Sequence, residues 1–394
     1  MKPGIVQRIF AEHYPTLNAT RRLDDRSRWA AWNILTCRTP AQGYHIDACP
    51  NGDYRIKLYN SCKHRACPLC GATETELWLE RQSAKEIHCP HHQIVFTSPD
   101  SLQELWRWNR KSFTGLYFHA AWHTLRALLG DTRRFGGLPG AIGVFQSWGD
   151  ELQEHIHLHF IITAGGLTAS GHWSEGDPKY LLPGAVLAAK FRGKFIAYLR
   201  AELTGKKGCK AGDPELRPPP SMTLQQTLDL LDSLRYVRWH VRIEEAYSNA
   251  GAVFKYAGRY IRRGPLSERR ILSYNGQNVC IAYAHPEKHA HTSFTLTALE
   301  FVRRVLDHVP ERCTHCVRTY GLYHSACRKK LNRVRHFLGQ QPYAPEAEPP
   351  DTHELIHRIF PDFTGDLCPK CHARLVTIKV FRPGHSPPSE RFAA

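Results

Sequence analysis

Three histidines alternate with aliphatic residues in the segment 154–162, EHIHLHFII. In a β-strand, alternate side chains lie on the same face, so the imidazoles of His155, His157 and His159 should point to one side. Two or three neutral imidazoles on one face bind a divalent cation well. The pattern therefore predicts a metal site on a strand, and by itself it also fits a zinc hydrolase.

A second candidate site is the basic segment 254–263, FKYAGRYIRR. A spacing of four residues places Tyr256 and Tyr260 on one face of a predicted helix. A phenol is a weak nucleophile at neutral pH and needs nearby cations or a metal to favour the phenolate. By itself the segment fits packed tyrosines with phosphate-binding arginines equally well, but beside a histidine strand it indicates phosphoryl chemistry. The cations that it offers to DNA are Lys255, Arg259, Arg262 and Arg263.

The chain has 13 cysteines, and several are clustered at C-x-x-C spacing, which favours metal ligands over disulfides. Four of them predict a closed tetrahedral zinc site with a structural role, in a knuckle that contacts DNA. His45 and His64 are the substitute ligands. The predicted zinc ligands are Cys49, Cys62, Cys67 and Cys70.

Two further C-x-x-C pairs lie towards the C-terminus. They predict either a second zinc site, in the manner of a zinc ribbon, or two unrelated thiol pairs. The pairs are Cys313 with Cys316 and Cys368 with Cys371.

Composition indicates the partner. Lysine and arginine number 53 against 36 acidic residues in a chain of 394, a net charge of +17. Such an excess favours a polyanion, and nucleic acid above all. The 42% hydrophobic content excludes wholesale disorder, and neither a spanning apolar run nor a signal-peptide core is present. We therefore expect a soluble protein of the cytoplasm that associates with DNA and not with membranes.

Short apolar or alternating runs predict the strands of one sheet at 92–98, 141–148, 155–163 and 236–243. Helical patterns surround them, with two lead-in helices before residue 37, and predict an α+β or α/β sheet domain. The expected helices between the strands cover 101–129, 184–204, 222–234 and 247–263. The expected division is a helical and zinc-binding region at 1–90, a nuclease domain at 91–310 with a loop insertion at 205–221, and a C-terminal region at 311–394 with a linker at 339–351.

Taken together, these motifs resemble a known family. The resembling stretches run in family order from about residue 4 to residue 335: CRTPAQGYHIDAC, YNSCKHRACPLC, HQIVFTSP, FQSWGDELQEHIHLHFIITAGGL, FRGKFIAYLR, KYAGRYIRR, LEFVRRVLDHVP and RTYGL. The chain resembles the rolling-circle insertion-sequence transposases of the HUH type, specifically the two-tyrosine IS91 family with its N-terminal zinc-binding domain.

The resemblance implies a fold: an antiparallel HUH nuclease sheet flanked by helices, an N-terminal helical and zinc-knuckle domain, and a small C-terminal module like a zinc ribbon. It also implies a DNA transposase that cuts and rejoins single-stranded transposon ends and target DNA through a 5′-phosphotyrosine. Mg²⁺ or Mn²⁺ would be the catalytic ion and Zn²⁺ the structural one. The family's histidine pair maps onto His157 and His159, and its tyrosines map onto Tyr256 and Tyr260.

His155 is then an extra histidine, and the third ligand of the catalytic ion is left open among His155, Asp150, Gln146 and Glu154. The chain departs from the family pattern at three positions, where it has Gly52, Ala66 and Ile156. The first two lack a ligand that the family knuckle carries, so one zinc ion is expected there.

Two alternatives to a transposase stay open. An HUH replication initiator or conjugative relaxase shares the histidine and tyrosine chemistry. A non-catalytic, zinc-stapled DNA-binding protein would bind DNA in a strongly salt-dependent way and would not cut it.

Overall fold

The strand with the three histidines lies in the middle of a five-stranded sheet. The computed structural model describes residues 4–205, 216–247, 264–284, 291–345, 351–359 and 362–382. Every strand pair in this sheet is antiparallel, as the family resemblance implies. In spatial order the strands are β13 (Val317–Gly321), β5 (Gly140–Trp148), β6 (Glu154–Thr163), β3 (His91–Thr97) and β9 (His240–Ile243).

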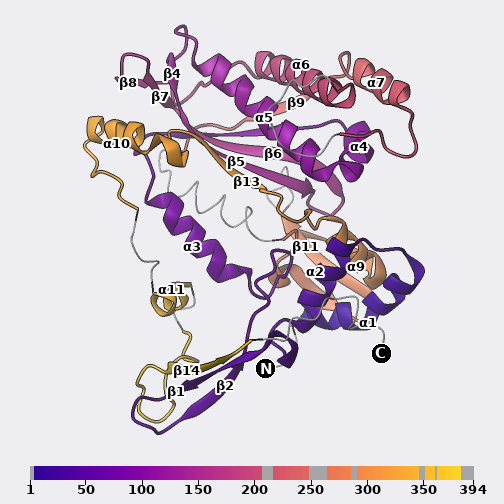
Figure 1. Cartoon of the computed structure of the whole chain (residues 1–394), viewed down its shortest axis with the longest axis vertical. Helices are drawn as coiled ribbons and strands as arrows, with labels where there is room; N and C mark the ends of the chain where they lie inside the picture. Colours follow the sequence, from indigo (N-terminus) through magenta and orange to yellow (C-terminus); the bar gives the residue numbers. More distant parts are fainter. Residues whose placement is uncertain are drawn as a thin grey trace.

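Helices cover one face of this sheet (Figure 1). Ile156, Leu158 and Phe160 alternate along β6 towards this face and are almost fully buried. They pack in a core rich in aromatic rings, where the Tyr117 and Phe195 centroids lie 4.9 Å apart. The covering helices are α4 (Gln103–Trp108), α5 (Arg110–Leu129), α6 (Gly184–Leu203) and α7 (Leu224–Ser233). This core fixes β6, so its histidines must point to the other face.

The histidine face is partly covered by a second apolar cluster. Leu331 and Val334 of α10 (Arg328–Phe337) pack there with Ile161 of β6, together with Leu79 of α3 (Gly71–Ser83). Within the described part of the chain, the buried members that β6 and β5 give to this cluster end at Ile161 and Val144. The histidine half of the face therefore lies beyond this apolar cover.

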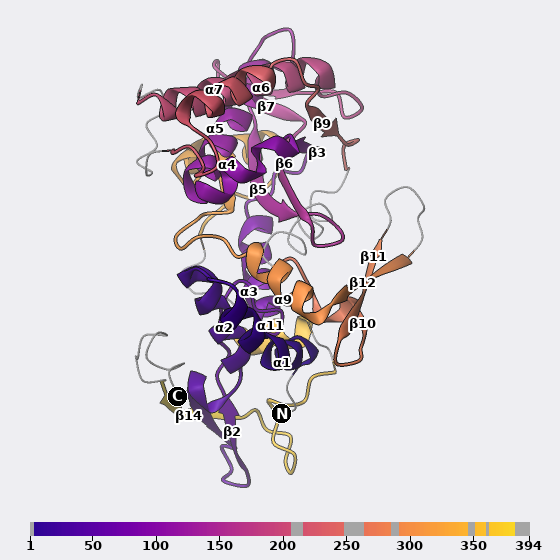
Figure 2. The ribbon, with the colours of Figure 1, turned by 90° about the vertical axis from the view of Figure 1, so that its right-hand side faces the viewer.

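A second body lies below the sheet domain (Figure 2). Helices α1 (Ile5–Thr20) and α2 (Asp25–Thr36) pack against α9 (Ala298–Asp307) and share one core with it. Asp24 caps the N-terminus of α2, since its carboxylate accepts a hydrogen bond from the Ser27 amide at 2.9 Å. A three-stranded sheet completes this body: β10 (Ile271–Tyr274), β11 (Asn278–Ala284) and β12 (His291–Thr297).

A third, smaller body joins a hairpin of the N-terminal region to the last described strand. Strand β14 (Val376–Phe381) pairs with β1 (Tyr44–Ala48), which also pairs with β2 (Arg55–Tyr59). The remaining short elements are β4 (Gly137–Leu138), β7 (Gly165–Thr168), β8 (Trp173–Glu175) and α11 (Thr352–Ile359). None of the helices described is long and apolar enough to cross a membrane.

Candidate active site and zinc centres

Strand pairing places several polar side chains on the histidine face. On β5, Gln146 pairs with His157, and on β3, Thr97 pairs with the same histidine. Further along, β9 contributes His240 opposite Thr97 and Arg242 opposite Val95. Since paired residues share a face, this side of the sheet carries imidazoles, an amide and a guanidinium together.

Hydrogen bonding and burial hold His157 as a neutral imidazole. Its Nδ1 lies 3.0 Å from the carbonyl oxygen of His155, and a carbonyl only accepts, so Nδ1–H donates. Burial, and after it the neighbouring imidazole of His159, holds the pKa of His157 well below its usual value near 6.5. A neutral imidazole carries one N–H, so Nε2 presents a lone pair. This arrangement, with Nδ1 donating to a carbonyl, is the usual support of a metal-binding histidine.

The Nε2 atom of His157 faces the side chain of Gln146. His157 Nε2 lies 2.9 Å from Gln146 Oε1, and the amide is almost fully buried. Two acceptors at this distance require either that the amide turns and donates its N–H, or that a cation bridges them. Neighbouring ligands of an octahedral ion with bonds of about 2.1 Å lie about 3.0 Å apart. The pair therefore fits adjacent coordination positions of a hard divalent cation.

His159 lies beside this pair. Its ring centroid is 4.8 Å from that of His157, and burial lowers its pKa to about 4. Gln93 Nε2 lies 3.3 Å from His159 Nδ1, so as placed the amide N–H donates to this ring. His159 presents the lone pair of Nε2 when the amide turns and its oxygen accepts from Nδ1–H. His155 itself is half-buried, with its ring centroid 5.2 Å from that of His157.

The other candidates for a third ligand lie elsewhere. Glu154 alternates onto the helix-covered face, where it accepts from Arg107 Nε at 2.8 Å. Asp150 is exposed on the turn between β5 and β6. Gln146 is thus the best placed of the four residues that the sequence left open.

A cysteine cluster lies where the N-terminal helices meet the zinc-knuckle segment. Cys62, Cys67 and Cys70 come together as predicted, but the fourth member is Cys37, directly after α2, and not Cys49. The four sulfurs lie within 4.8 Å of one another, and the Cys62 and Cys70 sulfurs are 3.6 Å apart. Zinc–sulfur bonds of about 2.3 Å set tetrahedral sulfurs about 3.8 Å apart, so the cluster fits one Zn²⁺.

The C-terminal cysteines also depart from the predicted set. Cys368 and Cys371 lie with Cys49, whose sulfur is 3.4 Å from that of Cys371. Cys313 is exposed, while Cys316 is buried in the core of the sheet domain, where its carbonyl accepts from the Phe145 amide. The structure therefore does not bring the two C-terminal C-x-x-C pairs together.

Comparisons with known proteins agree with this arrangement. A family model described as "Transposase zinc-binding domain" matches residues 9–98, and one described as "Putative transposase" matches residues 140–330. The "Putative transposase y4qJ" of Sinorhizobium fredii (strain NBRC 101917 / NGR234) is 30% identical over 362 residues, which cover 90% of this chain and 89% of that protein. The chain belongs to the IS91 family of transposases.

A second relative supports the same assignment. The "Transposase for insertion sequence element IS801" of Pseudomonas savastanoi pv. phaseolicola is 28% identical over 353 residues, which cover 87% of this chain and 80% of that protein. No solved structure matches the chain. The resemblance read from the motifs is thereby confirmed, and DNA is the partner of this transposase.

The segment with the two candidate tyrosines lies outside the described residues. This applies to Tyr256 and Tyr260 and to the neighbouring cations Lys255, Arg259, Arg262 and Arg263. The described chain stops at Tyr247, whose amide donates to the His91 carbonyl at 2.9 Å, and resumes at Gly264. A Cβ on Gly264 would lie 3.3 Å from Cα of Ala66, which precedes Cys67 of the Cys37 cluster. The described chain therefore resumes beside this cluster.

Sequence reasoning missed Arg242 of this face and Cys37 of the zinc cluster. Arg242 had a signal, because the alternation in YVRWHVRI puts it on the same side as His240. Cys37 had none, because it stands alone, outside any C-x-x-C spacing. Only the packing of α2 on the knuckle brings it near the other three cysteines.

Changing Cys37 to Ser should cost the transposase about one bound zinc ion per chain and lower the midpoint of thermal unfolding, because the site loses one of four thiolates. Metal content by mass spectrometry and thermal unfolding measure both effects. Cys327→Ser is the matched control, since this half-buried thiol lies outside both clusters. An unchanged zinc content in Cys37→Ser would remove Cys37 from the ligand set.

Acid should destabilise the transposase below about pH 6.5. Burial lowers the pKa values of His91, His159 and His308 to about 4 in the folded chain, so the unfolded chain binds protons that the folded chain does not. Stability is therefore lost as the pH falls from about 6.5 towards 4, by roughly 2 kcal/mol per histidine at pH 5. Urea unfolding at pH 7.5 and pH 5, with zinc content followed in parallel, checks this. Equal stability with zinc retained would mean that these histidines are not desolvated.

Proposed function

We propose that this transposase cuts single-stranded transposon ends by metal-assisted attack of a tyrosine and rejoins them to target DNA in rolling-circle-like transposition. The observation that carries the proposal is that His157 Nε2 lies 2.9 Å from Gln146 Oε1, with His159 beside it. A neutral donor set on a rigid central strand suits a cation that serves phosphate chemistry.

His157, His159 and Gln146 would hold the ion, and Mg²⁺ or Mn²⁺ suits this set. His155 remains a further candidate at the edge of the site. When bound, such an ion polarises the scissile phosphate and stabilises charge on the departing 3′ oxygen. The protein's own work is to keep both imidazoles neutral by burial and to orient His157 through the His155 carbonyl.

The nucleophile would be Tyr256 or Tyr260. Its phenolic oxygen loses a proton, attacks the phosphorus and displaces the 3′ oxygen, which takes up a proton. One phosphodiester is replaced by another, so a later attack by a 3′-hydroxyl can rejoin the strand without an energy source. Two tyrosines would allow one to cut and the other to take part in the subsequent strand transfer.

Strand cleavage tests the proposal. Labelled oligonucleotides from the ends of the element, single-stranded or as blunt duplexes, are incubated with the full chain and Mg²⁺, Mn²⁺ or EDTA. We expect cleavage of the single strands only, and only with the metal ion. Binding without cleavage under every ion would favour the zinc-stapled, non-catalytic DNA-binding protein. Cleavage of a replication or transfer origin in preference to element ends would favour an initiator or relaxase.

A further inference from the structure

We propose that Cys49, Asp53, Cys368 and Cys371 form a second zinc site that clasps the C-terminal strand β14 onto the N-terminal hairpin. Their ligand atoms all lie within 4.8 Å of one another. The Cys49 and Cys371 sulfurs are 3.4 Å apart, and Asp53 Oδ2 is 4.0 Å from the Cys49 sulfur. Three thiolates and one carboxylate complete a tetrahedral zinc site with no open position, which indicates a structural role.

Two tight Cys-Pro turns present these ligands to each other. In the first turn the Gly52 amide donates to the Cys49 carbonyl at 2.9 Å, and Gly52 has a φ of +80°. In the second turn the His372 amide donates to the Cys368 carbonyl, also at 2.9 Å. The first turn has a glycine where the second has Cys371, so Asp53, one residue later, supplies the fourth ligand.

The apolar packing around the clasp is small. The apolar cluster here has three buried members, and two of them are Cys49 and Cys368. On β14, the side chains of Val376, Ile378 and Val380 are more than half exposed. A structural metal is the usual means by which so small a core becomes stable. The clasp would thereby unite segments more than 300 residues apart.

Zinc content tests the clasp. We expect the full chain to hold two zinc ions, one of them in the Cys37 cluster, and the variant with Cys368→Ser and Cys371→Ser to hold one. The control variant, Cys313→Ser with Cys316→Ser, changes a C-x-x-C pair outside both clusters and should keep two. Limited proteolysis should release the β14 segment only from the first variant. Two zinc ions retained in the first variant, or a Cys49–Cys371 disulfide in the untreated chain, would overturn the proposal.

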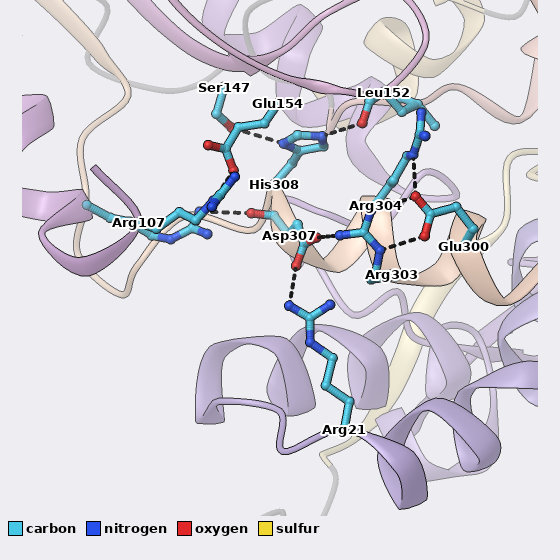
Figure 3. A network of polar contacts seen from close by, with 11 residues as sticks. Arg21, Arg107, Ser147, Leu152, Glu154, Glu300, Arg303, Arg304, Asp307 and His308 are labelled. Atoms are coloured by element: carbon cyan, nitrogen blue, oxygen red, sulfur yellow. Dashed lines mark hydrogen bonds and ion pairs between the residues drawn. The ribbon is translucent and has the colours of Figure 1, made fainter. Parts of the chain in front are cut away.

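A separate observation concerns a cleft of about 750 Å³ between the N-terminal helices, α4, α9 and the start of β6. Seven arginines and three carboxylates line it. The carboxylates hold several of these arginines in place (Figure 3): Arg107 binds Glu154 at 2.8 Å, and Asp307 accepts from Arg303 and lies 3.8 Å from Arg21. The arginines therefore keep an excess of positive charge in a fixed arrangement.

We infer that this cleft binds a segment of the single-stranded DNA; this inference rests on the proposed function. Trp108 lines the cleft with 60% of its surface exposed, and an exposed indole stacks on unpaired bases. Arg22 is exposed and, among the described residues, has no acidic partner, so it is available to a phosphate. Glu154 lines the cleft from the helix-covered side of the sheet, so the cleft reaches the beginning of the strand that carries the histidines.

Anisotropy with a fluorescent single-stranded oligonucleotide tests the cleft. Trp108→Ala should weaken binding roughly tenfold, and Arg22→Ala should lower the salt dependence by about one phosphate contact. Tyr236→Ala, at an aromatic side chain that is 91% exposed outside the cleft, is the matched control and should have no effect. Unchanged binding in both cleft variants overturns the inference. Cleavage by the unchanged chain is scored separately, so that failure of the nuclease is distinguished from failure of the cleft.

Discussion

Replacing Tyr256 and Tyr260 together by Phe should abolish the covalent protein–DNA adduct while leaving binding of single strands within about twofold. The change removes two hydroxyls and keeps both rings, so we expect folding and DNA binding to be retained. Without a phenolic oxygen no bond to phosphorus forms, and the loss should reach the detection limit, at least about 1,000-fold. Labelled single strands resolved on a denaturing gel measure the adduct, and anisotropy measures binding.

Single variants separate the two tyrosines. If one cuts first, its Phe variant should lose the initial adduct, and the other should lose only later strand joining. Tyr236→Phe is the control, because this exposed tyrosine lies in the loop before β9. An adduct that survives in the double Phe variant would show that another residue is the nucleophile. A double variant that no longer binds DNA would make the tyrosines structural.

Replacing His157 by Ala should lower the cleavage rate at least about 100-fold and leave DNA binding and folding intact, because the central imidazole of the metal site is removed. His159→Ala should have a similar effect. Gln146→Ala should cost about 10- to 100-fold and raise the Mn²⁺ concentration needed for half-maximal cleavage. Cleavage rates over a titration of Mg²⁺ and Mn²⁺ measure both the rate and the metal requirement.

The matched control is His172→Ala, which removes a mostly exposed imidazole between β7 and β8. It should cleave as the unchanged chain does. Full metal-dependent cleavage by His157→Ala would place the catalytic ion elsewhere. If Gln146→Ala loses DNA binding as well as cleavage, this amide supports the fold and is not a metal ligand.

Periodicity of two was enough to predict the centre of the sheet. The alternation in HIHLHFIIT sends Leu158 and Phe160 into the core and the histidines to the other face, and β3, β5 and β6 begin and end within one residue of the predicted strands. Strand β13 escaped prediction, because VRTYG has five residues of mixed polarity and is recognised only by its pairing with β5. Strand β9 is shorter than predicted, residues 240–243 instead of 236–243.

The two cysteine clusters show which ligands can be predicted from local sequence and which cannot. C-x-x-C spacing correctly groups Cys67 with Cys70 and Cys368 with Cys371, because neighbours in a turn stay neighbours in space. Their distant partners depend on tertiary packing: α2 delivers Cys37 to the first cluster, and pairing of β1 with β14 delivers Cys49 to the second. The N-terminal helices likewise share a core with α9, which no local pattern indicates.

The central claim is that a tyrosine cuts DNA and stays attached to its 5′ phosphate. It is tested most directly by identifying which DNA fragment remains covalently bound to the protein after cleavage. The full chain is incubated with Mg²⁺ or Mn²⁺ and single strands labelled at either the 5′ or the 3′ end, and the products are resolved on a denaturing gel. A 5′-phosphotyrosine predicts that only the 3′-labelled fragment is retarded with the protein, and that the 5′-labelled fragment carries a 3′-hydroxyl that a polymerase extends. Two results would contradict tyrosine transesterification by this transposase: cleavage in which neither the 5′-labelled nor the 3′-labelled fragment is bound to protein, or a 5′-labelled fragment that is retarded with the protein.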